Sequence, residues 1–197
     1  YELHKQFEPY WSPNGREILY WSGGKIFVAD DDRGTLHALA GGAAETVGQH
    51  PAWAADGSAV FDDIIRATGN TDIYIAHSDG HSLRRVFADH VSEGGPVWSP
   101  DGKRIAFIRY GTRPSLVVTD LAGHTRTLTT LKTRTRQALP QSIWGADPLP
   151  SPPAWSPDGT TIAVATRTGV KLVNVRSRTV RPWHRPPAEG VPVVVDW

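Results

Sequence analysis

The sequence predicts an all-β protein, a β-propeller assembled from four-stranded antiparallel blades. Three observations predict this fold. A motif that combines a tryptophan, a turn and a short apolar run occurs four times, the copies follow one another at 42, 45 and 57 residues, and no segment shows the 3.6-residue periodicity of an amphipathic helix. A period of about 40 to 45 residues is the length of a four-stranded propeller blade.

The recurring motif has a fixed internal spacing. In every copy a glycine stands four positions after the tryptophan and an aliphatic residue stands seven positions after it. Two offsets held through four copies indicate a structural repeat. The copies read "PYWSPNGREILY" at residues 9–20, "PAWAADGSAVFD" at 51–62, "PVWSPDGKRIAF" at 96–107 and "PAWSPDGTTIAV" at 153–164, with Trp11, Trp53, Trp98 and Trp155.

Each copy predicts four strands in order. The first strand carries the tryptophan, and the "SPDG" that follows suits a type I turn, in which proline fixes φ at the second position and glycine closes the fourth. The second strand, such as "RIAFIRY", is apolar on both faces, which suits a sheet covered on both sides. A third run ("KIFVAD", "DIYIAH", "SLVVTD", "VKLVNV") and a shorter fourth ("TLHALA", "SLRRVF", "TRTLTT", "TVRPW") complete each blade.

The repeat tryptophans are expected to be structural. We expect each of the four indoles to fill the space between its own blade and the adjacent one, because a side chain this large is seldom left outside the core of a repeat. Function is then expected where the copies differ from one another.

The repeat predicts one propeller domain with blades near 8–50, 51–94, 95–150 and 151–190, and the start of a further blade at 191–197. Four and a half blades do not close a ring, and the chain has no methionine, even at its first position. We therefore expect these residues to be part of a larger propeller of six or more blades. A separate piece of that kind leaves sheet edges and faces exposed for association.

Composition excludes several classes of function. The chain has 197 residues and a formal net charge of +1, which disfavours a general nucleic-acid binder. No apolar stretch approaches the roughly 20 residues of a membrane-spanning helix. There are no cysteines, so disulfides and thiolate metal sites are excluded, and no cofactor is predicted.

The motif resembles the WD-like repeat of TolB-type β-propellers, on the strength of "PVWSPDGKRIAF" and of "DIYIAHSDGHSLRRVF" at 72–87. The resemblance covers nearly the whole chain and is weakest at Trp53, where "AAD" replaces "SPD". It implies a propeller fold, a protein or peptide partner, and a place outside the cytoplasm, periplasmic or secreted at the cell envelope. Similar repeats also occur in prolyl-oligopeptidase-type peptidases, so the resemblance is less specific for function than for fold.

The candidate binding residues lie where the spacing changes. The 57-residue interval between Trp98 and Trp155 contains an insertion within residues 129–153, which carries Lys132, Arg134, Arg136 and the non-repeat Trp144. An aromatic side chain beside arginines is typical of a protein-interaction hot spot, although a solvated basic loop has the same composition. His50 and His90 precede the inner strands of the second and third blades, where they could approach the central channel.

Asp62 is the second departure from the repeat. It stands nine residues after Trp53, where the other copies have Tyr20, Phe107 and Val164, and Asp63 follows it. A carboxylate at that position must be paired, bound to a cation or exposed to solvent. Asp62 and Asp63 are weak metal candidates, because adjacent residues of a strand point to opposite sides. The Asp30–Asp32 run is expected to be a solvated acidic turn.

The favoured function is a non-catalytic scaffold that binds a protein or peptide. The chain has no Gly-x-Ser-x-Gly elbow, no cysteine nucleophile and no phosphate-binding glycine loop, so no catalytic residue is predicted. One alternative is the gating propeller of a prolyl-oligopeptidase-type serine peptidase whose catalytic domain lies outside this chain. A weaker alternative is a sugar-binding or lyase propeller with a histidine-ligated metal in its channel. The oligomeric state is not predicted.

Overall fold

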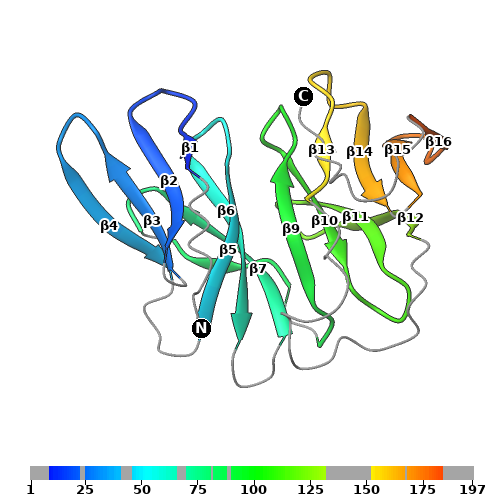
Figure 1. Cartoon of the computed structure of the whole chain (residues 1–197), viewed down its shortest axis with the longest axis horizontal. Helices are drawn as coiled ribbons and strands as arrows, with labels where there is room; N and C mark the ends of the chain where they lie inside the picture. Colours follow the sequence, from blue (N-terminus) through cyan, green and yellow to red (C-terminus); the bar gives the residue numbers. More distant parts are fainter. Residues whose placement is uncertain are drawn as a thin grey trace.

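The part of the chain that the structure describes folds into four four-stranded antiparallel sheets that lie next to one another (Figure 1). The computed structural model describes residues 9–22, 25–40, 46–65, 70–80, 82–87, 90–131, 152–166 and 168–183. These residues contain no helix, and thus none that is long and apolar enough to cross a membrane. The predicted all-β class and the predicted blades of four consecutive strands are confirmed.

Each sheet is a simple meander in chain order. In the middle of Figure 1, β5 and β9 lie side by side as the first strands of the second and third sheets. The strands are β1 (Tyr10–Trp11), β2 (Glu17–Ser22), β3 (Lys25–Asp30) and β4 (Thr35–Ala40); β5 (Thr46–Trp53), β6 (Ser58–Ile65), β7 (Asn70–His77) and β8 (Arg84–Arg85); β9 (Glu93–Trp98), β10 (Arg104–Arg109), β11 (Ser115–Asp120) and β12 (Thr125–Thr130); and β13 (Ala154–Trp155), β14 (Thr161–Thr166), β15 (Gly169–Asn174) and β16 (Val180–Pro182).

The Ser-Pro-Asp-Gly sequence forms the predicted turn between the first two strands of a sheet. In the third sheet the Gly102 N–H donates to the Ser99 carbonyl at 2.8 Å. The Ser99 hydroxyl accepts from the Arg104 N–H at 2.9 Å and itself donates to the Asp101 carboxylate. That hydroxyl bond, together with the Lys103 N–H, lowers the pKa of Asp101 despite partial burial. The first and fourth sheets repeat these contacts around Ser12 and Ser156.

The second sheet has a shorter hairpin than the others. Trp53 pairs with Ala59, six residues later, whereas Trp98 pairs with Ile105, seven residues later. This turn has one residue fewer between its glycine and the second strand, and Ala54 stands where the other turns have a serine. The Ser58 N–H donates to the Asp56 carboxylate there, at 2.9 Å. A one-residue shift turns every following side chain to the opposite face of the strand. Val60, seven residues after its tryptophan, therefore faces the third sheet, whereas Ile105 faces the second.

Apolar clusters fill the spaces between successive sheets, and three of the repeat tryptophans lie in them as expected. Trp53 packs on the cluster between the first and second sheets, Trp98 lies in the next cluster, and Trp155 in the third, where it is 7% exposed. The largest fully buried residues of these clusters include Leu19, Phe61, Ile73, Phe107, Ile108 and Ile162.

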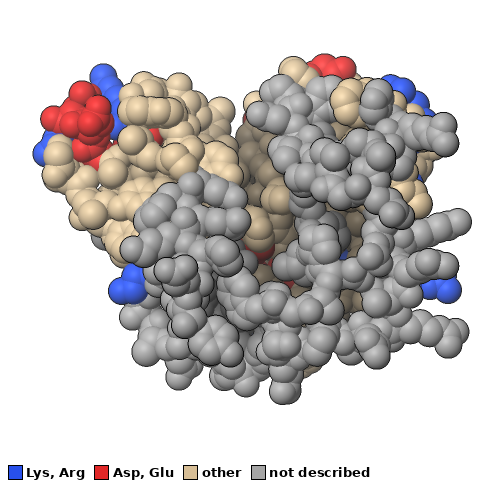
Figure 2. Space-filling view, viewed as in Figure 1, with Lys and Arg blue, Asp and Glu red and all other residues tan. Residues whose placement is uncertain are grey.

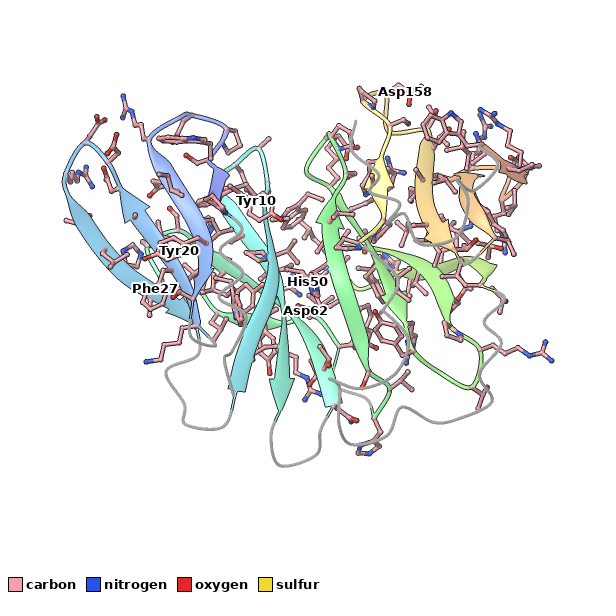
Figure 3. The ribbon with its side chains drawn as sticks, in the orientation of Figure 1. Tyr10, Tyr20, Phe27, His50, Asp62 and Asp158 are labelled. Carbon is pink, nitrogen blue, oxygen red and sulfur yellow. The ribbon has the colours of Figure 1, made fainter. Side chains whose placement is uncertain are left out.

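The expectation for Trp11 is wrong, because its side chain is 58% exposed. Trp11 lies on the first sheet, whose Leu19, Ile26 and Val28 face the second sheet. Tyr20 and Phe27 alternate with those residues and stack on each other with ring centroids 5.5 Å apart on the opposite face (Figure 3). Among the described residues no sheet packs on that face, so no neighbouring sheet buries the Trp11 indole.

The turn chemistry predicts an asymmetric result for serine substitutions. Ser99→Ala should lower the free energy of unfolding by about 1 kcal/mol, because the partly buried Arg104 N–H loses its acceptor. The reverse change in the second sheet, Ala54→Ser, should give no gain, since the Ser58 N–H in that turn already donates to the Asp56 carboxylate. Urea unfolding followed by tryptophan fluorescence measures both. Equal and opposite effects would contradict the proposed role of the serine.

The turn carboxylates also predict a pH dependence. The Ser156 hydroxyl, followed by the Thr160 N–H and hydroxyl, lowers the pKa of Asp158. A lowered pKa stabilises the fold above the unfolded value of about 3.9, and this stabilisation is lost as pH falls through the folded value. Asp158→Asn keeps the acceptor oxygen, as Asn14 does in the first sheet, but cannot titrate. The stability advantage of the wild type over this variant should therefore shrink between pH 6 and pH 3, and a constant difference in unfolding free energy would refute the explanation.

Candidate functional site

The structure brings together two residues that the sequence placed in different roles, His50 and Asp62. His50 lies on β5 and Asp62 on β6, and the His50 Nδ1 is 2.9 and 3.1 Å from the two carboxylate oxygens of Asp62. The Asp62 side chain is almost fully buried, and the His50 side chain is 32% exposed. Figure 3 shows both residues where the second sheet meets the third. The sequence allows Asp62 to be paired, bound to a cation or exposed to solvent, and the structure shows that it is paired.

The register shift of β6 explains why Asp62 is turned toward the third sheet. Val60 and Asp62 share one face of the strand, and Val60 packs in the cluster between these sheets. The Asp62 Oδ2 accepts the Gly95 N–H at 2.9 Å, so the carboxylate joins β6 to β9. Glycine is required beside it, because a Cβ at Gly94 would lie 2.8 Å from Oδ2.

His50 occupies a backbone position that favours glycine. Two residues of β5 stand opposite one of β6 at a β-bulge between Gln49 and Ala52. His50 has φ 44°, and Gly95, the corresponding bulge residue three positions before Trp98, has φ 63°. The left-handed conformation costs a histidine about 1 kcal/mol that glycine avoids. Such strain in a residue held by a buried carboxylate is a mark of functional positions.

The surroundings of Asp62 are rich in buried charge. Asp63, Asp72 and Glu93 are also buried, and two arginines offset them: Arg85 lies 2.6 Å from Asp72, and Arg109 lies 3.7 Å from Glu93. Burial, and secondarily the charge of Asp62, raises the pKa of Tyr110 far above its usual value. The Tyr110 hydroxyl therefore stays protonated at physiological pH, and the junction is a hydrogen-bonded polar cluster within an apolar interface.

The arrangement favours recognition through hydrogen bonds over metal chemistry. Asp62 faces the third sheet, while Asp63, the next residue, points to the other side and is paired in register with Asp72. The described residues contain no group of three or more histidine or acidic side chains placed to hold a metal ion. A partly exposed imidazole whose other side is fixed by a carboxylate can donate or accept one directed hydrogen bond.

Of the other predicted binding residues, the structure describes His90 alone. His90 is exposed and lies just before β9. Arg134, Arg136 and Trp144, together with Lys132, lie outside the described residues, and their binding role stays a prediction.

Sequence reasoning missed a pair of arginines between the third and fourth sheets. The Arg126 guanidinium donates to the Val175 carbonyl at 3.2 Å and to the Arg176 carbonyl at 2.9 Å. Arg104 lies 4.9 Å over the Trp155 ring. In the sequence both arginines look like ordinary surface residues. The only sequence feature that could have pointed to them is the repeat position of Trp155, because Arg104 lies over its ring.

Known proteins with the same architecture were found by structure, while no protein-family model matches the chain. The structure superposes on the crystal structure of TolB from Acinetobacter baumannii with a TM-score of 0.64 and 21% sequence identity, over 89% of this chain and 43% of that one. It superposes on a protein of Agrobacterium tumefaciens assigned as TolB with a TM-score of 0.69 and 22% identity, over 92% of this chain and 63% of that one.

The chain has a TolB-like β-propeller fold. In sequence it is also 38% identical over 55 residues to the Tol-Pal system protein TolB of Thioalkalivibrio sulfidiphilus, which is 27% of this chain and 13% of that protein. The chain spans less than two thirds of these TolB proteins. The resemblance read from "PVWSPDGKRIAF" is thus confirmed for the fold, and the four sheets are consistent with part of a propeller.

The TolB-like fold is shared with peptidases. A puromycin-hydrolysing peptidase of Mycobacterium tuberculosis superposes with a TM-score of 0.65 and 15% identity, over 93% of this chain and 30% of that one. At this identity the likeness concerns the fold alone.

The polar junction predicts a large loss of stability on removing its carboxylate. Asp62→Ala should lower the free energy of unfolding by about 2 to 3 kcal/mol, because the Gly95 N–H and the His50 imidazole both lose their partner inside the interface. Asp31→Ala, in the exposed turn after β3, is the matched control and should change stability by less than about 0.5 kcal/mol. Similar losses for the two variants would show that the junction is not special.

Proposed function

We propose that the chain is a non-catalytic propeller scaffold that binds a protein or peptide outside the cytoplasm. The observation that carries this proposal is the TolB-like fold, supported by the local sequence identity to a TolB of the Tol-Pal system. That relative is named as a protein of the Tol-Pal system, and this chain is proposed to bind a protein partner at the cell envelope.

The packing of the sheets suits a scaffold. Apolar clusters fix each sheet against the next, so loops at the sheet ends are held on a rigid frame. A rigid frame lowers the conformational entropy that a binding surface loses on association. Binding specificity then depends on side chains that differ between the copies, and His50 is such a residue, since glycine stands at its equivalent in the third sheet.

We propose that the partner contacts Trp144, Arg134 and Arg136 on the insertion, together with His50 and His90. An indole buried by a partner, with arginines around it, supplies most of the binding energy at many interfaces. His50 would add a directed hydrogen bond, because Asp62 fixes its ring.

Trp144→Ala tests this assignment. The substitution should reduce capture of the partner from an envelope extract at least about tenfold, the effect of losing an interface hot spot, without lowering the melting temperature. Trp11→Ala is the matched control, since it removes an indole that is exposed on the first sheet and plays no part in the proposal. Unchanged capture by Trp144→Ala, or an equal loss in both variants, would refute the assignment.

A second candidate function follows from the fold alone, which the chain shares with the M. tuberculosis peptidase. The chain would then be the propeller that controls access to a serine peptidase domain. The full sequence of the gene distinguishes the scaffold function from the peptidase function. A Gly-x-Ser-x-Gly elbow encoded downstream of these residues would favour the peptidase, and its absence would favour the scaffold.

A further inference from the structure

A groove between the third and fourth sheets gathers positive charge. It has a volume of about 410 Å³, and an adjoining hollow of about 260 Å³ shares Arg104, Arg126 and Val175 with it. The groove runs past the turn between β13 and β14 and the turn after β15. Its remaining lining residues are Gly159, Thr160, Asn174 and Arg176.

Two of the arginines are held rigidly by contacts between sheets. Arg104 lies over the Trp155 ring, with its Nη2 3.5 Å from the Gly159 carbonyl. Arg126 uses two of its five N–H donors on carbonyls of the fourth sheet, and the others remain for a ligand. Guanidinium groups fixed in this way lose little conformational entropy when they bind a carboxylate.

The positive charge of the groove is poorly balanced by the protein itself. In the described residues neither Arg126 nor Arg176 has a carboxylate partner, and Arg104 has only the half-exposed Asp101 at 3.7 Å. Asp120 and His124 line the adjoining hollow, where the Asp120 carboxylate is 2.8 Å from the His124 Nδ1.

The charged residues of the fourth sheet and its turns are mostly basic, like those of the groove. Among residues 152–183 the single acidic residue is Asp158, against Arg167, Lys171, Arg176, Arg178 and Arg181. Figure 2 shows basic atoms at the upper right, at the end of the molecule that the fourth sheet forms, and an acidic patch at the upper left, over the turn between β3 and β4. A field of one sign over one end attracts ligands of the opposite charge.

We propose that this groove binds an acidic peptide segment of a partner protein, through carboxylates that reach Arg104, Arg126 and Arg176. The inference rests on the proposed function as a protein-binding scaffold and names the chemistry of one partner segment. Planar guanidinium groups match carboxylates, and Thr160 and Asn174 add uncharged hydrogen-bonding groups. A nucleic acid is disfavoured, because none of the described residues that line the groove has an aromatic ring on which a base could stack, and Trp155 is covered by Arg104.

The groove is tested with the protein alone and a defined probe. A fluorescein-labelled peptide of alternating Gly and Glu is titrated at low ionic strength and followed by fluorescence anisotropy. We expect saturable binding that weakens as salt is added, and a loss of affinity of about fivefold or more in Arg176→Glu, because an exposed side chain is reversed in charge. Arg176 contributes only its backbone carbonyl to the contact with Arg126, so the fold should be unaffected.

Arg113→Glu is the matched control, since it makes the same change of charge at an exposed site between β10 and β11. It should leave peptide affinity within about twofold of the wild type. Equal losses in Arg176→Glu and Arg113→Glu would overturn the proposal in favour of unspecific attraction. Binding of a single-stranded oligonucleotide of equal charge, with no binding of the peptide, would overturn it in favour of nucleic acid.

The result of the groove test can be distinguished from the result of the test of the proposed function. If Arg176→Glu leaves peptide affinity unchanged while Trp144→Ala abolishes partner capture, the scaffold function stands and the groove does not contribute. If Trp144→Ala changes nothing while Arg176→Glu weakens peptide binding, the groove stands and the insertion does not carry the contact.

Discussion

The structure depends on one repeated contact, in which the tryptophan of the second, third or fourth sheet packs against the preceding sheet. The Trp53 Nε1 donates to the Tyr10 carbonyl at 2.9 Å, and the Trp155 Nε1 lies 3.4 Å from the Val97 carbonyl. In both cases the acceptor is the residue just before the preceding sheet's own tryptophan. The indole thus combines burial of a large apolar surface with a hydrogen bond that fixes its height along the neighbouring strand. Because the second, third and fourth sheets each pack a tryptophan against the preceding sheet, the sheets stack in chain order.

The second sheet departs from this regularity, and the polar site is a consequence. Its hairpin lacks one residue, so β6 turns Asp62 toward the third sheet, and the carboxylate joins His50 to Gly95. At the same boundary the buried Trp98 Nε1 has no hydrogen-bond partner among the described residues. The Asp62 contacts replace a lost indole bond as the directed link between these two sheets. Buried charge is tolerated there because the nearby carboxylates of Asp72 and Glu93 lie beside arginines.

The fold could be predicted from the sequence because the same motif of tryptophan, turn and apolar strand occurs four times. Trp, Gly and aliphatic offsets predicted the turn of Ser99–Gly102 and the burial of Trp98 and Trp155. The offsets failed at Trp11, since burial requires a neighbouring sheet and not a motif, and at Val60, since identical spacing hides a shorter hairpin. The pairing of His50 with Asp62 was not predictable, because it depends on that one-residue shift. The arginine groove was missed because it is formed by residues some 50 positions apart, such as Arg126 and Arg176.

Hydrogen exchange of the indole N–H groups, resolved by NMR and assigned by substitution, tests the repeated tryptophan contact most directly. The Nε1 proton of Trp155, which is 7% exposed and bonded to the preceding sheet, is expected to exchange slowly. The Nε1 proton of Trp11, which is 58% exposed, is expected to exchange at a rate close to that of free indole. Rapid exchange at Trp155, comparable to that at Trp11, would contradict the stacking of the sheets through their tryptophans.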